Sequence, residues 1–402
     1  MPWAVRMFLI VSAVALPLYL YVGFRTATAI AALSGSPPRR ARLWALGAIG
    51  WLYLLPVLYV GFWLGGNRSA PLLGGTTLGL LDYLFNFPFW WGLIVLLETL
   101  PYFLLLEAIG LVSRMIGAFS PFWRRWAPRL RVATLSCIAL YAAVRIYLDT
   151  FTVDATSVSV QTGVPAPELD SLTITLAADI QVDRYTNGDK IRRFETLFRA
   201  HRCDLLLFAG DLVTNGKGFI AQASAIMAHP DCRLGAFAVM GDHDYWSDPN
   251  GIPQILRSSG WTFLTDEHQV VEHGGRRILL SGVTYIYSQR ISESELRAFL
   301  SAAPPADLKI LLVHQPAEML VRLAAEAGYH LVLAGHTHGG QIVLHPFGLP
   351  VAPSIFETPF YRGAQRLGNT TVVVTGGVGQ SLAPVRYGAP AELTYITLRT
   401  AR

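Results

Sequence analysis

Four long apolar segments in the first 150 residues constrain the fold of this chain more than any other feature. They span Met7–Phe24, Leu43–Gly66, Phe87–Ser113 and Val132–Leu148, and the first two carry no charge. Apolar stretches of about 18 residues or more are long enough to cross a bilayer as a helix. The hydrophobic content of 52% is also high for a wholly soluble protein. The sequence therefore predicts an all-α transmembrane region of about four helices over residues 1–150.

The third and fourth segments leave alternatives open. Glu98 and Glu107 lie in the third, where a carboxylate at membrane depth is costly and suggests a function. A hydrogen bond between helices explains them equally well. In the fourth segment, Arg145 must reach the membrane surface or pair with Asp149, one turn later. An amphipathic helix on the membrane surface is the alternative there.

Arginines between the apolar segments predict the orientation in a cell membrane (inner or plasma membrane). The connection between the first and second segments contains Arg25, Arg39, Arg40 and Arg42. The connection between the third and fourth segments contains Arg114, Arg124, Arg125, Arg129 and Arg131. The positive-inside rule places both connections in the cytoplasm, so with four spans everything after Leu148 is extracytoplasmic. A cleaved signal peptide ending near Ala29 would place the first connection outside, against the rule. Because these arginines also account for the net charge of +5, we expect no nucleic-acid partner.

The three cysteines are too few for a disulfide framework. Cys137 lies in an apolar segment and is expected to serve packing. Cys203 and Cys232 each precede a predicted strand, so they start at the same edge if these strands are neighbours. Either a disulfide in an oxidising compartment or two free thiols fits this placement.

Residues 151–171 contain Pro165 and Pro167 and are interpreted as a linker. From residue 172 to 402, strand-like runs alternate with helical stretches, which predicts an α/β domain. The expected strands cover residues 172–177, 204–209, 235–240, 261–264, 270–273, 276–283, 308–313, 331–333, 370–375 and 393–398. The expected helices cover residues 190–201, 219–228, 293–301 and 317–327.

Five of these strands end in an aspartate or a histidine. The motifs are Asp179-Ile180-Gln181, Gly210-Asp211, Gly241-Asp242-His243-Asp244, His314-Gln315 and Gly335-His336-Thr337-His338. Each one alone is a common turn or helix cap. In open α/β sheets, however, sites form at the carboxyl ends of the strands, so five such ends should converge. Carboxylates, an amide and imidazoles in one cleft suit divalent metals such as Mn, Fe or Zn.

This order and spacing of motifs resembles the calcineurin-like metallophosphoesterases over roughly residues 172–398. The segment from Gly376 to Glu392 is similar to the C-terminal end of their membrane-anchored bacterial branch. The resemblance implies a mixed β-sheet sandwich flanked by helices, with two divalent metal ions. One ion would be held by Asp179, Gln181, Asp211 and His338, and the second by Asp211, Asp242, His314 and His336.

The resemblance also implies a reaction. His243 would contact the substrate phosphoryl group and assist the leaving oxygen, while hydroxide held between the metals attacks phosphorus. The substrate would be a phosphomonoester, a phosphodiester or a pyrophosphate. Should the fourth span fail, a cytoplasmic phosphodiesterase acting on nucleotides is expected instead.

Three positions depart from the family pattern. Gln181 replaces a histidine and is the weaker ligand, while Asp242 replaces an asparagine and adds negative charge. Thr214 stands where many relatives have an aspartate that orients the catalytic histidine, so the orientation of His243 must come from elsewhere. A catalytically weak or inactive membrane receptor or scaffold is therefore the alternative function.

Clues to the substrate are few. Arg386 is a candidate for binding a phosphate oxygen, with a structural salt bridge as the alternative. Residues 345–362 mix aromatic residues with glycine and proline soon after the last metal motif. They either pack in the core or form an apolar rim that faces the bilayer and admits a lipid-linked phosphate ester or pyrophosphate.

Overall fold

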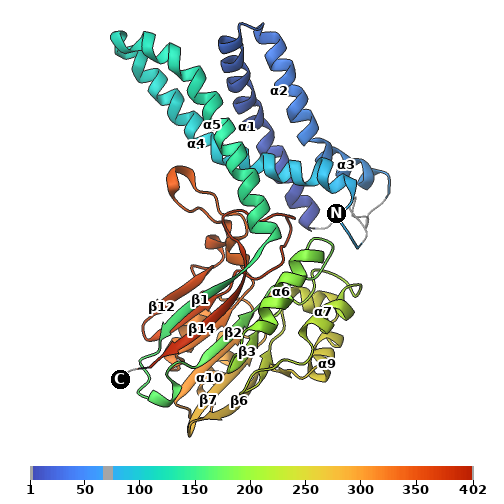
Figure 1. Cartoon of the computed structure of the whole chain (residues 1–402), viewed down its shortest axis with the longest axis vertical. Helices are drawn as coiled ribbons and strands as arrows, with labels where there is room; N and C mark the ends of the chain where they lie inside the picture. The colour runs from blue at the N-terminus through green and yellow to red at the C-terminus, as the bar shows by residue number, and fades with distance from the viewer. Residues whose placement is uncertain (1–2, 67–75, 401–402) are drawn as a thin grey trace. The chain divides into compact units, whose positions relative to one another are not determined.

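The computed structural model describes residues 3–66 and 76–400 and divides the chain into two units (Figure 1). The first unit comprises Met1–Tyr147, Leu344–Val351 and Leu382–Gly388. The second comprises Leu148–Val343, Ala352–Ser381 and Ala389–Arg402. Along the chain, the first boundary between the units, at Tyr147 and Leu148, lies close to the predicted division at residue 150. The segments Leu344–Val351 and Leu382–Gly388 are counted with the helices of the first unit.

Hydrogen bonds within the first unit explain this assignment. The Glu98 carboxylate accepts from the backbone N–H of His345 at 2.7 Å and from the hydroxyl of Tyr387 at 3.0 Å. The backbone N–H of Phe347 donates to the Tyr102 hydroxyl at 3.0 Å, and the two rings lie 4.6 Å apart. Buried Glu98 thus has specific partners, and they lie far along the chain rather than on another helix.

Five α-helices make up most of the described part of the first unit. They are α1 (Trp3–Ser34), α2 (Pro38–Leu52), α3 (Leu54–Leu64), α4 (Phe87–Met115) and α5 (Ser120–Phe151), with a π-helical turn at Asp82–Asn86 and a 3-10 turn at Gly117–Phe119. Three of them, α1, α4 and α5, are long and apolar enough to cross a membrane. This confirms the prediction of N-terminal membrane-spanning helices.

The second predicted span is broken. Helices α2 and α3 are long and apolar enough to cross a membrane only when taken together. They meet at Tyr53 with a bend of 46°. Pro56 supplies the cause, because it has no N–H for the carbonyl of Leu52 and its ring clashes with that carbonyl. The helices therefore provide three candidate spans, or up to four if the bent pair is one span.

Glu107 joins three helices of the first unit. Its carboxylate pairs with Arg25 of α1 at 2.7 Å and with Arg131 of α5 at 2.9 Å. Glu107 itself lies on α4. Interhelical pairing, the structural alternative for an intramembrane carboxylate, is therefore what the structure shows here.

The second unit is a sandwich of two six-stranded mixed sheets. The first sheet has the order β1-β14-β2-β3-β4-β5 and contains β1 (Val153–Gln161), β14 (Ala391–Arg399), β2 (Thr173–Ala177), β3 (Leu205–Phe208), β4 (Ala236–Ala238) and β5 (Thr262–Phe263). The second has the order β12-β13-β11-β10-β7-β6 and contains β12 (Gly363–Leu367), β13 (Thr370–Val374), β11 (Leu331–Ala334), β10 (Leu308–Val313), β7 (Arg276–Val283) and β6 (Glu267–His273). A two-stranded hairpin joins β8 (Tyr285–Ile286) to β9 (Gln289–Arg290).

Helices cover the outer faces of both sheets. Side chains of α6 (Gly188–Ala200), α7 (Ile220–Met227) and α9 (Gly251–Ser258) pack on the first sheet, while α10 (Glu293–Ser301) and α11 (Glu318–Glu326) pack on the second. Leu205 and Leu207 of β3 pack between the sheets, whereas Leu206 and Phe208 pack under the helices. Strands buried on both faces read as continuous apolar runs, which is why the sequence revealed them. The predicted mixed sandwich flanked by helices is confirmed.

The linker prediction for residues 151–171 was wrong over much of its length. Residues Val153–Gln161 form β1, which pairs in parallel with β14 along its whole length. Its partner lies more than 200 residues away in the chain, and polar residues such as Asp154 and Ser157 hide the strand pattern. Cys203 and Cys232 form a disulfide between neighbouring chain segments, with Cα atoms 5.1 Å apart. The disulfide alternative therefore holds.

Candidate metal centre

The predicted ligands follow the carboxyl ends of five parallel strands from the two sheets. Asp179 and Gln181 follow β2, Asp211 follows β3, and Asp242 opens helix α8 (Asp242–Ser247) after β4. In the second sheet, His314 follows β10, and His336 and His338 follow β11. All seven side chains lie in buried or half-buried positions. The sandwich therefore brings the ends of both sheets to one place, as the sequence predicted.

The backbone at these residues is strained. Asp179, Gln181, Asp211, His336 and His338 all have φ between 45° and 72°. Non-glycine residues in this left-handed region cost on the order of 1–3 kcal/mol each and persist where the fold holds them. Backbone bonds do so here, since Asp179 N–H donates to Gly210 and Gln181 N–H donates to Asp211. Such clustered strain is typical of functional sites.

Two glycines of the motifs are required by close approach. A Cβ at Gly241 would overlap the Asp211 carboxylate, and a Cβ at Gly335 would overlap the side chains of Ala178 and Asp179. Any larger residue at either position would push a ligand carboxylate out of place. The glycines that flank the predicted ligands thus have a steric function.

Asp242, His314 and His336 form one cluster of potential metal ligands. Asp242 Oδ2 lies 3.1 Å from His336 Nδ1 and 3.3 Å from His314 Nε2. The two imidazole nitrogens are themselves 3.3 Å apart. Three ligand atoms this close together can bind one small divalent ion.

Asp179, Asp211 and His314 form a second cluster, so His314 belongs to both. Asp211 Oδ2 lies 3.4 Å from His314 Nε2 and accepts from the Gln181 amide at 3.3 Å. His338 Nε2 lies 3.7 Å from Asp179 Oδ1. The structure thus brings the seven predicted ligands together.

Two buried oxygen atoms of this second cluster have no hydrogen-bond partner among the described residues. They are Asp179 Oδ1 and Gln181 Oε1. Buried polar atoms without a partner are costly, and a bound cation would satisfy both. Because a carboxylate only accepts, the Gln181 atom that contacts Asp211 must be its NH₂ group, which leaves the amide oxygen for a metal. The residues present therefore fit a divalent metal ion.

The charges of the cluster are strongly coupled without a metal. Burial raises the pKa of Asp179 to about 6, and the charge of Asp211 acts in the same direction. Burial opposes the charge on His336, but hydrogen bonds to Asp242 and Glu357 outweigh it and raise the pKa of His336 to about 9. Burial also opposes ionisation of Asp211 and Asp242, yet the neighbouring histidines hold both pKa values below their ordinary range. Protonated imidazoles thus compensate the carboxylates in the metal-free protein.

His243 is oriented by a backbone group. Its Nδ1 contacts the carbonyl oxygen of Thr214, and its Nε2 lies 3.4 Å from Ser381 Oγ. Since a carbonyl oxygen can only accept, Nδ1 carries a proton and Nε2 is the atom available to a substrate. Thr214, which replaces the expected aspartate, therefore positions His243 through its main chain. Its hydroxyl is used elsewhere and contacts Gln181 O and Asp183.

Several supporting residues were not assigned a role from the sequence. Asp244 accepts from the backbone N–H groups of Asp211, Leu212 and Gly241, and burial raises its pKa to about 7. Its place within the third motif, Gly241-Asp242-His243-Asp244, could have indicated it. Glu357, by contrast, accepts from His336 Nε2 at 3.0 Å and from the Tyr287 hydroxyl at 2.7 Å. No sequence pattern indicated Glu357.

Arg386 is the residue that the sequence suggested for binding a phosphate oxygen. Its side chain is fully buried in the segment Leu382–Gly388, which belongs to the first unit. The role of Arg386 in substrate binding therefore stays a prediction.

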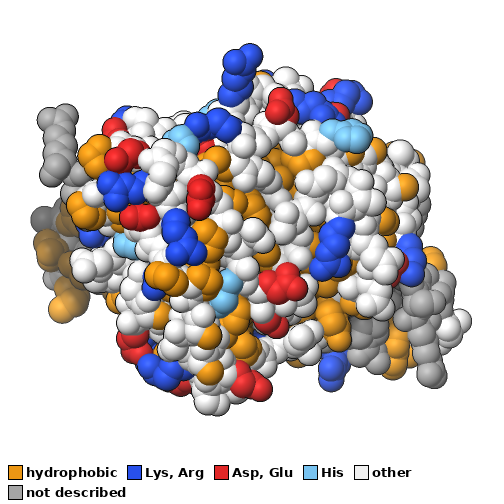
Figure 2. Space-filling view, turned by 90° about the horizontal axis from the view of Figure 1, so that it is seen from below, with side chains coloured by type: hydrophobic (Ala, Val, Ile, Leu, Met, Phe, Trp, Pro, Cys, Tyr) orange, Lys and Arg blue, Asp and Glu red, His pale blue; other side chains and the backbone are white. Residues whose placement is uncertain are grey.

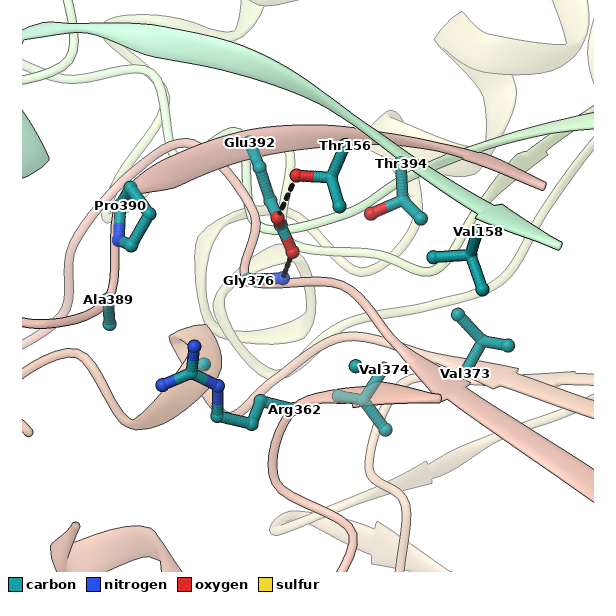
Figure 3. Close-up of a pocket in the computed structure, with 12 residues that line it drawn as sticks. Thr156, Val158, Arg362, Val373, Val374, Gly376, Ala389, Pro390, Glu392 and Thr394 are labelled. Atoms are coloured by element: carbon teal, nitrogen blue, oxygen red, sulfur yellow. Dashed lines mark hydrogen bonds between the residues drawn. The ribbon is translucent and has the colours of Figure 1, made fainter. Parts of the chain in front are cut away.

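A separate cavity of about 150 Å³ lies within the second unit (Figure 3). Its lining includes Thr156, Arg362, Gly376 and Glu392 but none of the predicted ligands. The Glu392 carboxylate accepts from Thr156 Oγ1 at 2.5 Å and from the backbone N–H of Gly376 at 2.8 Å, as Figure 3 shows. These bonds join β1 and β14 to the segment after β13, so Glu392 has a structural function there.

Replacing Glu357 with alanine is expected to weaken metal binding. His336 presents Nδ1 to the cluster while Nε2 contacts Glu357, an arrangement in which the carboxylate fixes the imidazole. Loss of such a partner typically lowers metal affinity by about 10–100-fold. Titration of the full-length protein with Mn²⁺ would measure the change. Tyr287→Phe, which keeps the carboxylate, is the control, and an unchanged affinity in Glu357→Ala would contradict this role.

Comparison with known proteins agrees with the geometry. Residues 172–340 match the model of the family described as calcineurin-like phosphoesterase. A bovine (Bos taurus) protein named transmembrane protein with metallophosphoesterase domain is 30% identical over 247 residues, which cover 58% of this chain and 54% of that protein. An uncharacterized metallophosphoesterase of Aquifex aeolicus (strain VF5) is 26% identical over 268 residues, which cover 65% of this chain and 98% of that protein. The chain thus spans about half the length of the bovine relative.

Proposed function

Because residues 172–340 match the calcineurin-like phosphoesterase family, we propose that this chain is a membrane-anchored, dinuclear, metal-dependent phosphoesterase. It would hydrolyse a phosphomonoester, a phosphodiester or a pyrophosphate. One observation carries the proposal. Two clusters of carboxylates and imidazoles share His314, and two buried oxygens without a hydrogen-bond partner among the described residues fit a divalent cation. A dinuclear centre of this kind is suited to phosphoryl chemistry.

The ligand residues would divide as the sequence suggested. Asp179, Gln181, Asp211 and His338 would hold one ion, and Asp211 would bridge to a second ion held by Asp242, His314 and His336. When bound, Mn, Fe or Zn ions would activate a water molecule and neutralise charge on the phosphoryl oxygens. His243 would give the proton on Nε2 to the leaving oxygen while its Nδ1–H stays on the Thr214 carbonyl. Asp244 would hold the Asp211 backbone in its strained conformation.

A weakly active or inactive receptor or scaffold remains the second candidate, since Gln181 is a poorer ligand than histidine. The buried, unpaired Oε1 of Gln181 favours the enzyme, because this atom has no other function among the described residues. The two functions differ in metal content and turnover.

The experiment uses the full-length protein in detergent, supplied with Mn²⁺. We expect about two ions per chain and hydrolysis of bis-p-nitrophenyl phosphate or p-nitrophenyl phosphate. His338→Ala should abolish turnover, and Gln181→His should tighten the first site because imidazole is the stronger ligand. One ion or none, with no turnover of either ester, would favour the receptor or scaffold.

We also propose that the second unit lies on the extracytoplasmic side of a cell membrane. The arginine-rich connections support this orientation. The Cys203–Cys232 disulfide supports it too, since disulfides persist in oxidising compartments and are rare in the cytoplasm. On the face shown in Figure 2, basic and acidic side chains are interspersed, a pattern unlike the basic stripe of a nucleic-acid binder.

Thiol labelling of the protein extracted from cells tests this orientation. Free thiols are alkylated at lysis under denaturing conditions without a reductant. Only Cys137 should then carry a label, and Cys203 and Cys232 should become reactive only after reduction. We expect this result because the disulfide persists in an oxidising compartment, whereas the cytoplasm would keep both cysteines reduced. Mass spectrometry of the intact chain counts the labels. Alkylation of all three cysteines without reduction would place the domain in the cytoplasm.

A further inference from the structure

Large hydrophobic side chains are exposed at the metal centre. Beyond helix α5, the described part of the second unit exposes Trp246 (51%), Tyr287 (51%), Ile355 (56%), Phe356 (92%) and Leu367 (36%). The rings of Trp246 and Tyr287 contact histidines of the metal centre, and Ile355 and Phe356 directly precede Glu357 in the chain. We call these four residues the apolar rim. Scattered exposed hydrophobics are normal, but a group of them at one place marks an interaction site.

Each member of the apolar rim contacts, or directly precedes in the chain, a residue of the metal centre or its hydrogen-bond partner Glu357. The Trp246 ring lies edge-on to His243, with centroids 5.0 Å apart. The Tyr287 ring lies edge-on to His336 at 5.3 Å, and its hydroxyl donates to Glu357. Ile355 and Phe356 directly precede Glu357 in the chain. Any group that covers the rim must therefore lie beside the reacting phosphate.

The segment that carries Ile355 and Phe356 is held in place. Thr337 Oγ1 donates to the Tyr361 carbonyl at 2.6 Å, and Thr358 Oγ1 donates to the Pro316 carbonyl at 2.6 Å. Two of the metal-ligand loops are thus tied to this segment. Its exposed side chains are presented by fixed backbone, so their exposure is not that of a loose loop.

A basic group stands beside the aromatic rings. The Arg290 guanidinium carbon lies 5.4 Å from the ring centroids of both Tyr285 and Tyr287. Aromatic rings with an adjacent arginine are the combination that proteins place at membrane interfaces and against anionic lipid headgroups. A small soluble phosphate ester would leave most of this apolar surface in water.

We propose that the substrate of the metal centre is a lipid phosphate, whose phosphate group enters the centre while its hydrocarbon chain lies on the apolar rim. This inference rests on the proposed phosphoesterase function. In the reaction, water gives up a proton to solvent as its oxygen bonds to phosphorus, and the bond from phosphorus to the lipid or diphosphate oxygen breaks. That oxygen takes a proton from His243, which regains one from solvent. The helices that can span a bilayer place the chain where such substrates occur. The rim refines the sequence hypothesis for residues 345–362, since Trp246 and Tyr287 lie far from that segment in the chain.

The test compares substrates that share a phosphate group and differ in their hydrocarbon chain. Full-length protein in mixed micelles with Mn²⁺ is given dioleoyl phosphatidic acid or glycerol 3-phosphate, and farnesyl diphosphate or dimethylallyl diphosphate. The double variant Ile355→Ser/Phe356→Ser removes most of the exposed apolar surface of the segment. Leu367→Ser removes an exposed hydrophobic side chain elsewhere in the domain and is the matched control.

The double variant should lower kcat/KM for at least one long-chain substrate by about 10–100-fold, the loss expected for two buried apolar side chains. For the short-chain partner of that substrate and for p-nitrophenyl phosphate, kcat/KM of the double variant should stay within about threefold of the wild type. Leu367→Ser should leave kcat/KM for every substrate unchanged. An equal loss on short and long substrates would show that the segment only supports the fold. Unchanged hydrolysis of the long substrates would also overturn the proposal.

Photolabelling keeps the inference testable if the wild type hydrolyses no ester, an outcome that would refute the proposed function. Phosphatidic acid with a diazirine in its acyl chain should label the peptide that contains Ile355 and Phe356. The matching diacylglycerol, which has no phosphate, should label it at least about fivefold less. Equal labelling by both lipids would mean simple contact with the membrane. No labelling would point to a protein partner, and either result would overturn the proposal.

Discussion

Full-length protein carrying His314→Ala is expected to lose at least about 10³-fold in turnover of any ester the wild type hydrolyses, because several kcal/mol of charge stabilisation depend on the metal centre. His314 is the residue shared by both ligand clusters. Its Nδ1 lies 2.7 Å from the Ala209 carbonyl, which fixes the ring, and its Nε2 faces both Asp211 and Asp242. The variant should also bind less metal, since each ion would lose or misplace a ligand.

His273→Ala is the control for this prediction. His273 is a histidine of the same domain that contacts Arg233 and lies outside both clusters. Circular dichroism should confirm that both variants fold, and mass spectrometry of bound metals should show a loss only in His314→Ala. Turnover within about tenfold of the wild type would mean that His314 is not a metal ligand.

His243→Gln is expected to lower hydrolysis of alkyl phosphate esters by about 10²–10⁴-fold, the usual contribution of a general acid. Esters of p-nitrophenol should lose much less, because p-nitrophenolate leaves without a proton. Bound metal should stay at the wild-type level, since His243 contacts Thr214 and Ser381 rather than a metal ligand through its side chain. The comparison of leaving groups separates proton transfer from simple loss of structure.

Ser381→Ala serves as the matched variant, because it changes the other group beside Nε2 while keeping the imidazole. Turnover of alkyl and nitrophenyl esters by both variants would show whether the dependence on the leaving group appears only with His243→Gln. An equal loss on alkyl and nitrophenyl esters would contradict a role of His243 as the acid.

Much of the metal centre was predictable because it depends on local patterns. Buried strands read as apolar runs, and the residue that follows each run lies at the carboxyl edge of its sheet. Asp179, Asp211, Asp242, His314 and His336 could therefore be placed together from their positions in the sequence. The ligand roles remain predictions until metal content is measured.

Other features depended on contacts between distant parts of the chain. Glu357 reaches His336 through a segment with no recognisable motif, and the Thr214 main chain replaces an expected side chain in holding His243. The contact between the Thr214 carbonyl and His243 could not be predicted, because the type of side chain at a position does not reveal which group its backbone carbonyl binds. The partners of Glu98 likewise come from segments that sequence alone assigned to another domain.

The sequence by itself determined the apolar helices, the α/β order of the second unit and the strand ends that carry the ligands. These features could be predicted because hydropathy and the spacing of apolar residues are local patterns of a few residues. Only the tertiary structure decided that Val153–Gln161 is a strand, since its partner β14 lies at the other end of the chain. Only the tertiary structure, too, brought the Trp246 ring to His243 and the Tyr287 ring to His336. Such neighbours arise when two sheets pack, and packing is a property of the whole domain that no local stretch encodes.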